Sequence, residues 1–108
     1  MNLKSEYQIV LVTAPLLPIA RKLTQQILTA KLAACVNILP AVESHYWWQG
    51  KLTRSGEVLM LIKTTSDHLK ALRRLIKRNH PYETPEFVAL AIDSGSKKYL
   101  KWITDSVA

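Results

Sequence analysis

The chain has little of several features that would place it in common classes of protein. Its single cysteine, Cys35, excludes an internal disulfide framework. Three glycines are too few for the glycine-rich loops that hold nucleotide phosphates. No stretch approaches the ~20 uninterrupted apolar residues of a membrane span, and residues 1–6 lack the apolar core of a secretory signal. These absences predict a soluble cytoplasmic protein.

Common catalytic and metal-binding motifs are also missing. The sequence has no His-x-x-x-His pair, no Cys-x-x-Cys pair, no phosphate-binding loop and no nucleophile elbow. No complete catalytic constellation can be assembled from it, and we expect no membrane partner.

What the chain does have is a large apolar fraction and a positive charge. Its 108 residues, 48% of them hydrophobic, predict one domain, residues 1–108, with a substantial core. The net charge is +7, and five cations share one arc of the predicted helix Asp67–Arg78. These are Lys70, Arg73, Arg74, Lys77 and Arg78. The pattern favours an amphipathic helix with a solvated basic face; the alternative, nucleic-acid binding, lacks interleaved aromatic residues.

The run Ala34–Trp48 is too long for the domain that carries it. Fully extended it would reach roughly 50 Å, whereas a domain of this size spans about 34 Å. Gln49-Gly50 then predicts a turn into a second strand, Lys51–Thr65. The hairpin tip would carry three aromatic side chains with no core beneath them: Tyr46, Trp47 and Trp48. Exposed strand edges and aromatic rings favour aggregation unless another subunit covers them, so we predict that these three residues lie at an oligomer interface.

The remaining pattern predicts a ferredoxin-like α+β fold. Besides the hairpin, the sequence indicates strands at Ile9–Val12, Val58–Ile62 and Phe87–Ile92. It indicates one helix that begins at Pro15, a second that begins at Asp67 and is capped by Ser66, and a third over Tyr99–Val107. Pro40 predicts an edge position or a bulge in the long strand. The order βαββαβ with right-handed crossovers gives four strands with the two main helices on one face. The second sheet face is also apolar and needs a cover, which predicts association with other subunits. Three subunits packing their sheets inward would supply that cover, although the number three does not follow from composition.

Two places could carry chemistry. Cys35 fits a buried core residue, an activated nucleophile of a cysteine-dependent enzyme or a soft-metal ligand. The segment His80–Glu83 puts an imidazole, a phenol and a carboxylate into a rigid loop, which fits either a ligand site or a structural turn.

Several blocks of the sequence resemble the signature of the CutA family, the divalent-cation tolerance proteins. The blocks are Thr13–Pro15, Lys31–Pro40, Tyr46–Lys51, Ile62–Thr64 and His80–Glu86. The resemblance implies a ferredoxin-like fold, a tight homotrimer related to the PII signalling proteins, and a link to copper and other divalent ions. The resemblance implies no established enzymatic reaction. The expected function is therefore that of a non-enzymatic, homotrimeric tolerance or response protein.

The chain departs from the family at groups that could bind metal. Some members have cysteine where this chain has Val12, and some have a histidine pair where it has Asn79-His80. Of one thiol and two imidazoles, only His80 remains. One imidazole does not hold Cu(II) tightly, so a site must recruit other groups or be weak.

We therefore predict a weak divalent-cation site, Cu(II) included, formed by His80 with Cys35 or Glu83 between subunits. A small-ligand pocket is predicted beside it, shaped by Lys63, Tyr82 and Trp48. The alternative functions are a basic nucleic-acid-binding module and, less favoured, a cysteine-dependent enzyme.

Overall fold

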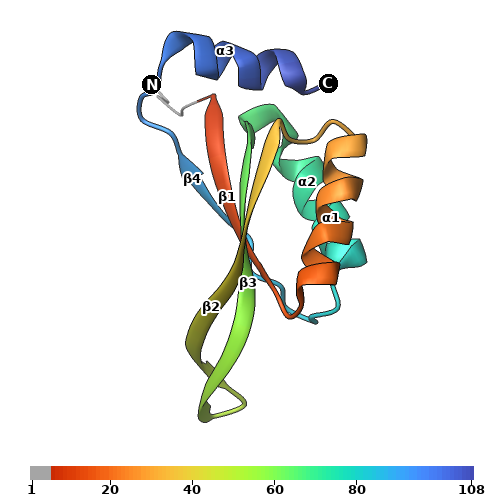
Figure 1. Ribbon diagram of the computed structural model, residues 1–108, viewed down its shortest axis with the longest axis vertical. Coiled ribbons are helices and arrows are strands. Elements are labelled where there is room, and N and C mark those ends of the chain that lie inside the picture. Colours follow the sequence, from red (N-terminus) through yellow and green to blue (C-terminus); the bar gives the residue numbers. More distant parts are fainter. Residues whose placement is uncertain (1–5) are drawn as a thin grey trace.

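In a computed structural model, which describes residues 6–108, the chain forms one sheet with two helices packed against it (Figure 1). The strands are β1 (Tyr7–Ala14), β2 (Cys35–Trp48), β3 (Lys51–Thr65) and β4 (Val88–Ala91), and the helices are α1 (Leu17–Thr29), α2 (Leu69–Asn79) and α3 (Lys97–Ser106). The strand order is β2-β3-β1-β4, with every neighbouring pair antiparallel. This arrangement confirms the predicted ferredoxin-like fold.

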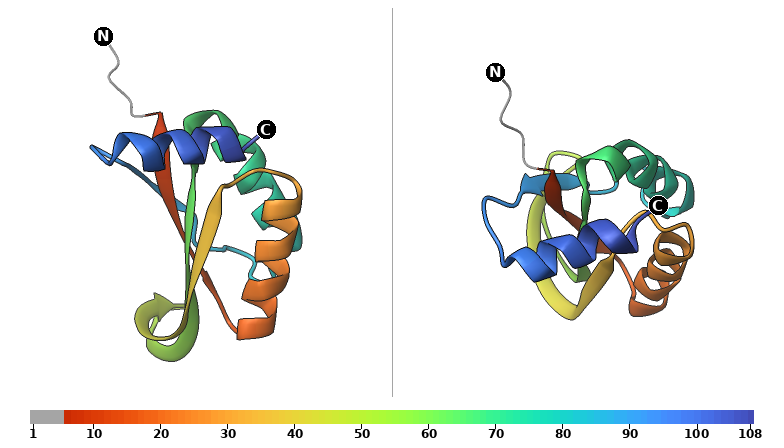
Figure 2. Two further views of the ribbon diagram at one scale, coloured as in Figure 1. Left: turned by 45° about the horizontal axis from the view of Figure 1, so that its top comes forward. Right: turned by 90° about the horizontal axis from the view of Figure 1, so that it is seen from above.

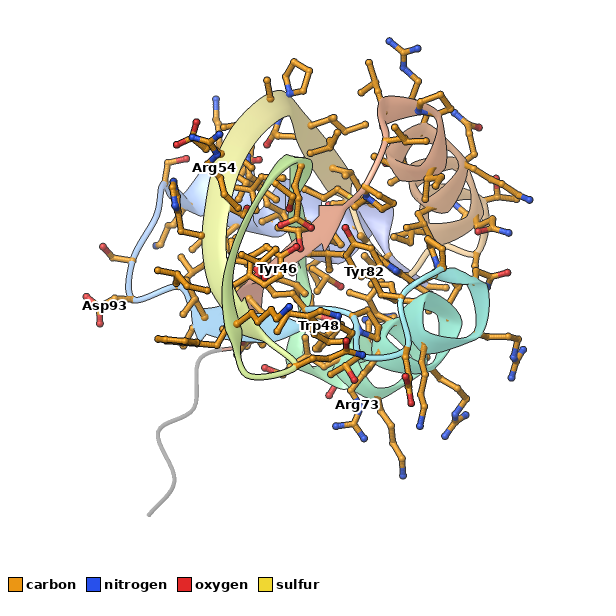
Figure 3. The ribbon with its side chains drawn as sticks, turned by 90° about the horizontal axis from the view of Figure 1, so that it is seen from below. Tyr46, Trp48, Arg54, Arg73, Tyr82 and Asp93 are labelled. Carbon is orange, nitrogen blue, oxygen red and sulfur yellow. The ribbon has the colours of Figure 1, made fainter. Side chains whose placement is uncertain are left out.

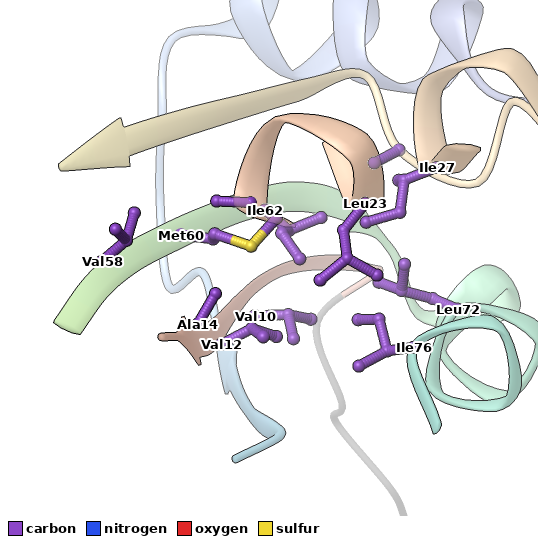
Figure 4. Close-up of a cluster of buried hydrophobic side chains, with 12 residues drawn as sticks. Val10, Val12, Ala14, Leu23, Ile27, Val58, Met60, Ile62, Leu72 and Ile76 are labelled. Carbon is purple, nitrogen blue, oxygen red and sulfur yellow. The ribbon is translucent and has the colours of Figure 1, made fainter. Parts of the chain in front are cut away.

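The core lies between the sheet and the helices α1 and α2 (Figure 4). In β1 every second residue is fully buried, and in β3 Val58, Met60 and Ile62 take the same alternation. Successive side chains of a strand point to opposite faces, so these residues all meet the helices. Leu23 and Leu72 fill the space from the helix side and are at most 1% exposed.

The hairpin of β2 and β3 extends beyond the core, as predicted (Figures 1 and 2). Its two-residue turn has positive φ angles, 50° at Gln49 and 77° at Gly50. Two such residues form the type I′ turn whose twist matches that of the strands it joins. β2 is an edge strand, and its register with β3 shifts between Leu39 and Val42, on either side of Pro40. The predicted edge or bulge at Pro40 is thus confirmed.

The opposite face of the sheet is only partly covered. Cross-strand partners place the apolar residues Ile9, Leu11, Leu39, Leu59, Leu61, Val88 and Leu90 on this face. Helix α3 crosses one end of it (Figure 2), where the Lys63 ammonium lies 5.6 Å from the centre of the Tyr99 ring. Beyond α3, Val88 and Leu90 are 46% and 50% exposed. The uncovered apolar face that the sequence indicates is therefore present in the protomer.

Some predicted boundaries were wrong. Ser66 does not cap the second helix: residues Ser66–His68 form a 3-10 turn before α2, and the Ser66 hydroxyl instead donates to the carbonyl of Glu6. The first helix starts at Leu17 rather than at Pro15. The last strand, expected over Phe87–Ile92, is Val88–Ala91. These shifts leave the sheet order unchanged.

None of the helices in the described chain is long and apolar enough to cross a bilayer.

Candidate functional site

A pocket of 760 Å³ lies where the hairpin leaves the core and faces the loop after α2. Its lining comprises Thr13, Ser44, His45, Tyr46, Trp48, Glu57, Pro81, Tyr82, Glu83, Thr84, Pro85 and Glu86. Figure 3 views this end of the molecule and shows Tyr46, Trp48 and Tyr82 on neighbouring parts of it. We call it the Glu57 pocket.

His80 fixes the loop that forms one wall of the pocket. It follows the last residue of α2, and its backbone N–H donates to the carbonyl of Ile76. The ring is 8% exposed, its Nε2–H donates to the carbonyl of Thr13 at 2.7 Å, and its Nδ1 accepts from the N–H of Tyr82 at 3.1 Å. A carbonyl only accepts and an amide N–H only donates, so this is the pattern of a neutral imidazole with both nitrogens engaged.

Glu57 is the most buried ionisable group of the pocket. Only 9% of the residue is exposed, and one carboxylate oxygen accepts a 2.7 Å hydrogen bond from the Tyr82 hydroxyl. Burial, followed by this hydrogen bond and the charge of Glu57, raises the pKa of Tyr82 well above its usual range. Tyr82 therefore stays protonated and donates to Glu57 throughout the physiological range. Within residues 6–108, no lysine or arginine forms a salt bridge with Glu57.

Two further carboxylates line the pocket, Glu83 and Glu86. Partial burial, and then the negative charge of Glu57, raise the pKa of Glu86 above its ordinary value. The lining contains no lysine or arginine, although the chain as a whole carries a net charge of +7. The pocket is therefore a locally acidic site in a basic protein.

The structure brings together some of the predicted site residues and separates others. Tyr82, Trp48 and Glu83 line the same pocket. Lys63 does not, since it lies directly across from Cys35 at the other end of the β2–β3 ladder and contacts Tyr99. Of the three residues predicted to shape a ligand pocket, Tyr82 and Trp48 thus lie together and Lys63 lies apart from them.

Within one chain, the predicted metal ligands Cys35 and His80 lie far apart. Cys35 lies opposite Lys63 of β3, and Lys63 in turn lies opposite Ile9 of β1. The His80 side chain is hydrogen-bonded to the carbonyl of Thr13, which is four residues further along β1 than Ile9. At ~3.3 Å per residue this separates the two ends by roughly 13 Å. The Cys35 sulfur lies 3.8 Å from the Asn37 side chain. In the described part of the chain, no three His, Cys, Asp or Glu residues are placed so that they could hold one metal ion.

Sequence reasoning missed Glu57 and Glu86. Glu57 stands immediately before the apolar run Val58–Ile62, and a charged residue beside a buried strand segment is the signal that could have identified it. Its partner Tyr82 is 25 residues away, so only the folded chain reveals the contact.

Comparisons with known proteins agree with the fold. Residues 8–106 match the family described as CutA1 divalent ion tolerance protein. The chain is 46% identical over 99 residues to the divalent-cation tolerance protein CutA of Yersinia pestis strain Pestoides F, covering 92% of this chain and 83% of that protein. It is also 46% identical over 98 residues to the protein CutA 1, chloroplastic, of Oryza sativa subsp. japonica, covering 91% of this chain but only 55% of the rice protein.

A crystal structure of CutA1 from Oryza sativa superposes with a TM-score of 0.93 at 42% identity, covering 99% of this chain and 98% of that one. Sequence and structure thus agree over nearly the whole described chain. The chain belongs to the CutA1 divalent ion tolerance protein family.

Proposed function

We propose that this protein is a homotrimeric, non-enzymatic cation-response protein that binds its cation in the Glu57 pocket. The observation that carries the proposal is the Glu57 carboxylate, which is 9% exposed and has no salt-bridge partner in the described chain. A buried carboxylate without a countercharge is unfavourable, and a bound cation would relieve that cost. Membership in a divalent ion tolerance family supports a cation as the ligand.

We place the pocket at a cleft between subunits. Two of its walls, Tyr46 and Trp48, belong to the hairpin overhang, where they are 37% and 50% exposed. A neighbouring subunit that covers the overhang would close the pocket on that side. It could also supply the ligands that one chain does not bring together.

The donor set favours hard divalent cations over Cu(II) within a single chain. Glu57, Glu83 and Glu86 offer carboxylate oxygens, which suit ions such as Mn²⁺ or Mg²⁺. The described part of one chain does not gather three such ligands around one centre, so a neighbouring subunit would have to complete the site. Cu(II) binding by His80, as predicted, requires the ring to give up its bond to Thr13 or to Tyr82. Any copper affinity is therefore expected to be weak, micromolar at best.

Replacing Glu57 with glutamine should weaken divalent-cation binding by about tenfold or more. The substitution keeps the size of the side chain and its ability to accept from Tyr82 but removes the buried charge, and hydrogen bonds to charged groups are worth roughly 1.5–3 kcal/mol. Isothermal titration calorimetry with Mn²⁺ and with Cu²⁺ on the assembled protein would measure the change.

His80→Ala is the matched test of the predicted imidazole ligand. If His80 only holds the loop, Cu²⁺ affinity should change far less than in Glu57→Gln, provided that circular dichroism shows an intact fold. A Glu57→Gln protein that binds both metals as wild type does would contradict the proposal. A Cu²⁺ site lost specifically in His80→Ala would instead assign the metal to the imidazole.

Cation affinity should fall on acidification, beginning at a higher pH than an ordinary glutamate allows. The raised pKa of Glu86 means that this carboxylate takes up its proton above the ordinary value of 4.5 as the pH falls. A cation favours the deprotonated form, so affinity is present above that pKa and is lost below it. Calorimetry from pH 8 to pH 4.5 on wild type and Glu86→Gln would show a shallower decline in the variant. A decline centred near ~6.5 that disappears in His80→Ala would point to the histidine instead.

We also propose a cytoplasmic location, the prediction made from the sequence. The name of the rice relative assigns that protein to the chloroplast. Fractionation of cells that express the tagged full-length protein would test the location.

A further inference from the structure

The Glu57 pocket is much larger than one metal ion requires. Its volume of 760 Å³ falls in the range of roughly 300–1,000 Å³ typical of small-molecule sites, whereas one water molecule occupies about 30 Å³ in the liquid. A single ion would leave most of the space to solvent, so the size favours an organic ligand.

The acidic groups of the pocket do not converge on a point. Divalent ions need several ligand atoms around one centre, and no three potential ligands in residues 6–108 are placed to supply them. Glu57 comes from β3, and Glu83 and Glu86 come from the loop after α2. Carboxylates spread over two elements suit a ligand with positive charges at more than one position.

The walls are aromatic and carry no lysine or arginine. Tyr46, Trp48 and Tyr82 line the pocket together with the three glutamates (Figure 3). The faces of aromatic rings attract ammonium groups and also pack against methylene chains. Carboxylates accept short, charge-assisted hydrogen bonds from ammonium N–H groups. This combination of walls matches an alkylammonium ion better than a hydrated metal ion.

We propose that the Glu57 pocket binds an extended organic cation with two ammonium groups, of the diamine or polyamine class. The inference rests on the proposed cation-binding function of the same pocket. One ammonium pairs with Glu57, which accepts from the Tyr82 hydroxyl but forms no salt bridge in the described chain, and the second pairs with Glu83 or Glu86. The alkyl chain between them packs against Trp48 and the two tyrosines.

The test compares 1,4-diaminobutane with n-butylamine, which has the same carbon chain but one charge. Calorimetry on the assembled full-length protein, at pH 7 and fixed ionic strength, should show the diamine binding at least about tenfold more tightly. Glu57→Gln should weaken diamine binding by about tenfold or more. Asp93→Asn is the charge-matched control, because Asp93 is exposed and lies away from the pocket (Figure 3), and it should bind as wild type does.

Trp48→Leu tests the aromatic wall and should weaken diamine binding by roughly twofold to thirtyfold, the range that corresponds to the loss of one cation–π contact. If Glu57→Gln does not fold, the double variant Glu83→Gln and Glu86→Gln takes its place, because it removes both carboxylates that could hold the second ammonium. Equal affinity for the two amines, or full diamine affinity in the glutamate variant, overturns the inference. Mn²⁺ binding that depends on Glu57, without any diamine binding, overturns this inference and leaves the proposed function standing. Failure of both Mn²⁺ and the diamine to bind overturns both.

Discussion

Replacing Trp47 and Leu52 with serine should make the assembly dissociate at a protomer concentration at least about 30-fold higher than wild type. The two residues are cross-strand partners on the overhang, and they are 73% and 68% exposed in the protomer. Large apolar side chains at the centre of an interface each contribute about 2 kcal/mol or more when truncated, and ~1.4 kcal/mol corresponds to a tenfold change. Trp47 does not line the Glu57 pocket, so this variant leaves the pocket walls intact.

Light scattering over a dilution series measures the effect. Leu16→Ser serves as the control, because Leu16 is 60% exposed but belongs to the N-cap of α1 and not to the hairpin. Unchanged assembly of the Trp47 and Leu52 variant would mean that the tip is not an interface. A wild-type protein that is a stable 12.3 kDa monomer at micromolar concentration would contradict the trimer altogether.

Leu23→Ala should lower the free energy of unfolding by about 2–5 kcal/mol, as is typical when a buried leucine is truncated. Leu23 is 1% exposed and packs among the core residues of α1, the sheet and α2 (Figure 4). The loss combines the transfer free energy of the missing atoms with the cavity that they leave.

Leu28→Ala is the matched control on the same helix. Leu28 is 36% exposed, and substitutions at exposed positions usually change stability by about 0.5 kcal/mol or less. Guanidinium unfolding must compare the proteins at one protomer concentration, because assembly contributes to apparent stability. If Leu23→Ala and Leu28→Ala lowered the free energy of unfolding equally, the cluster around Leu23 would not dominate the stability of the fold.

The uncovered sheet face and the overhang both expose apolar side chains to solvent. Val88 and Leu90 are about half exposed, and the rings of the hairpin tip are 37% to 73% exposed. Continuous apolar surface of this kind is uncommon on soluble monomers. The proposed trimer would cover these surfaces, so mutations at either one should change both oligomer size and thermal stability.

The elements followed from the sequence because they depend on local patterns. Short continuous apolar runs predicted β1 and the buried part of β3, helical spacing predicted α1 and α2, and the excess length of residues 34–48 predicted the overhang. The boundaries of helices and strands were predicted less accurately than their existence, as Ser66 shows. Its hydroxyl donates to the carbonyl of Glu6, which lies 60 residues away in the sequence, and a contact of that range overrides the local preference for a cap.

The site depended on contacts between distant segments. The sequence by itself determined that His80, Tyr82 and Glu83 share a loop and that Trp48 ends a long strand. Only the tertiary structure decided that Tyr82 donates a hydrogen bond to Glu57 and that both ring nitrogens of His80 are hydrogen-bonded. It also decided that Lys63 and Cys35 lie opposite each other at the end of the β2–β3 ladder away from the pocket. The physical reason is register: the pairing of β1 with β3 and of β2 with β3 sets which residues lie side by side, and composition and spacing do not specify that pairing residue by residue.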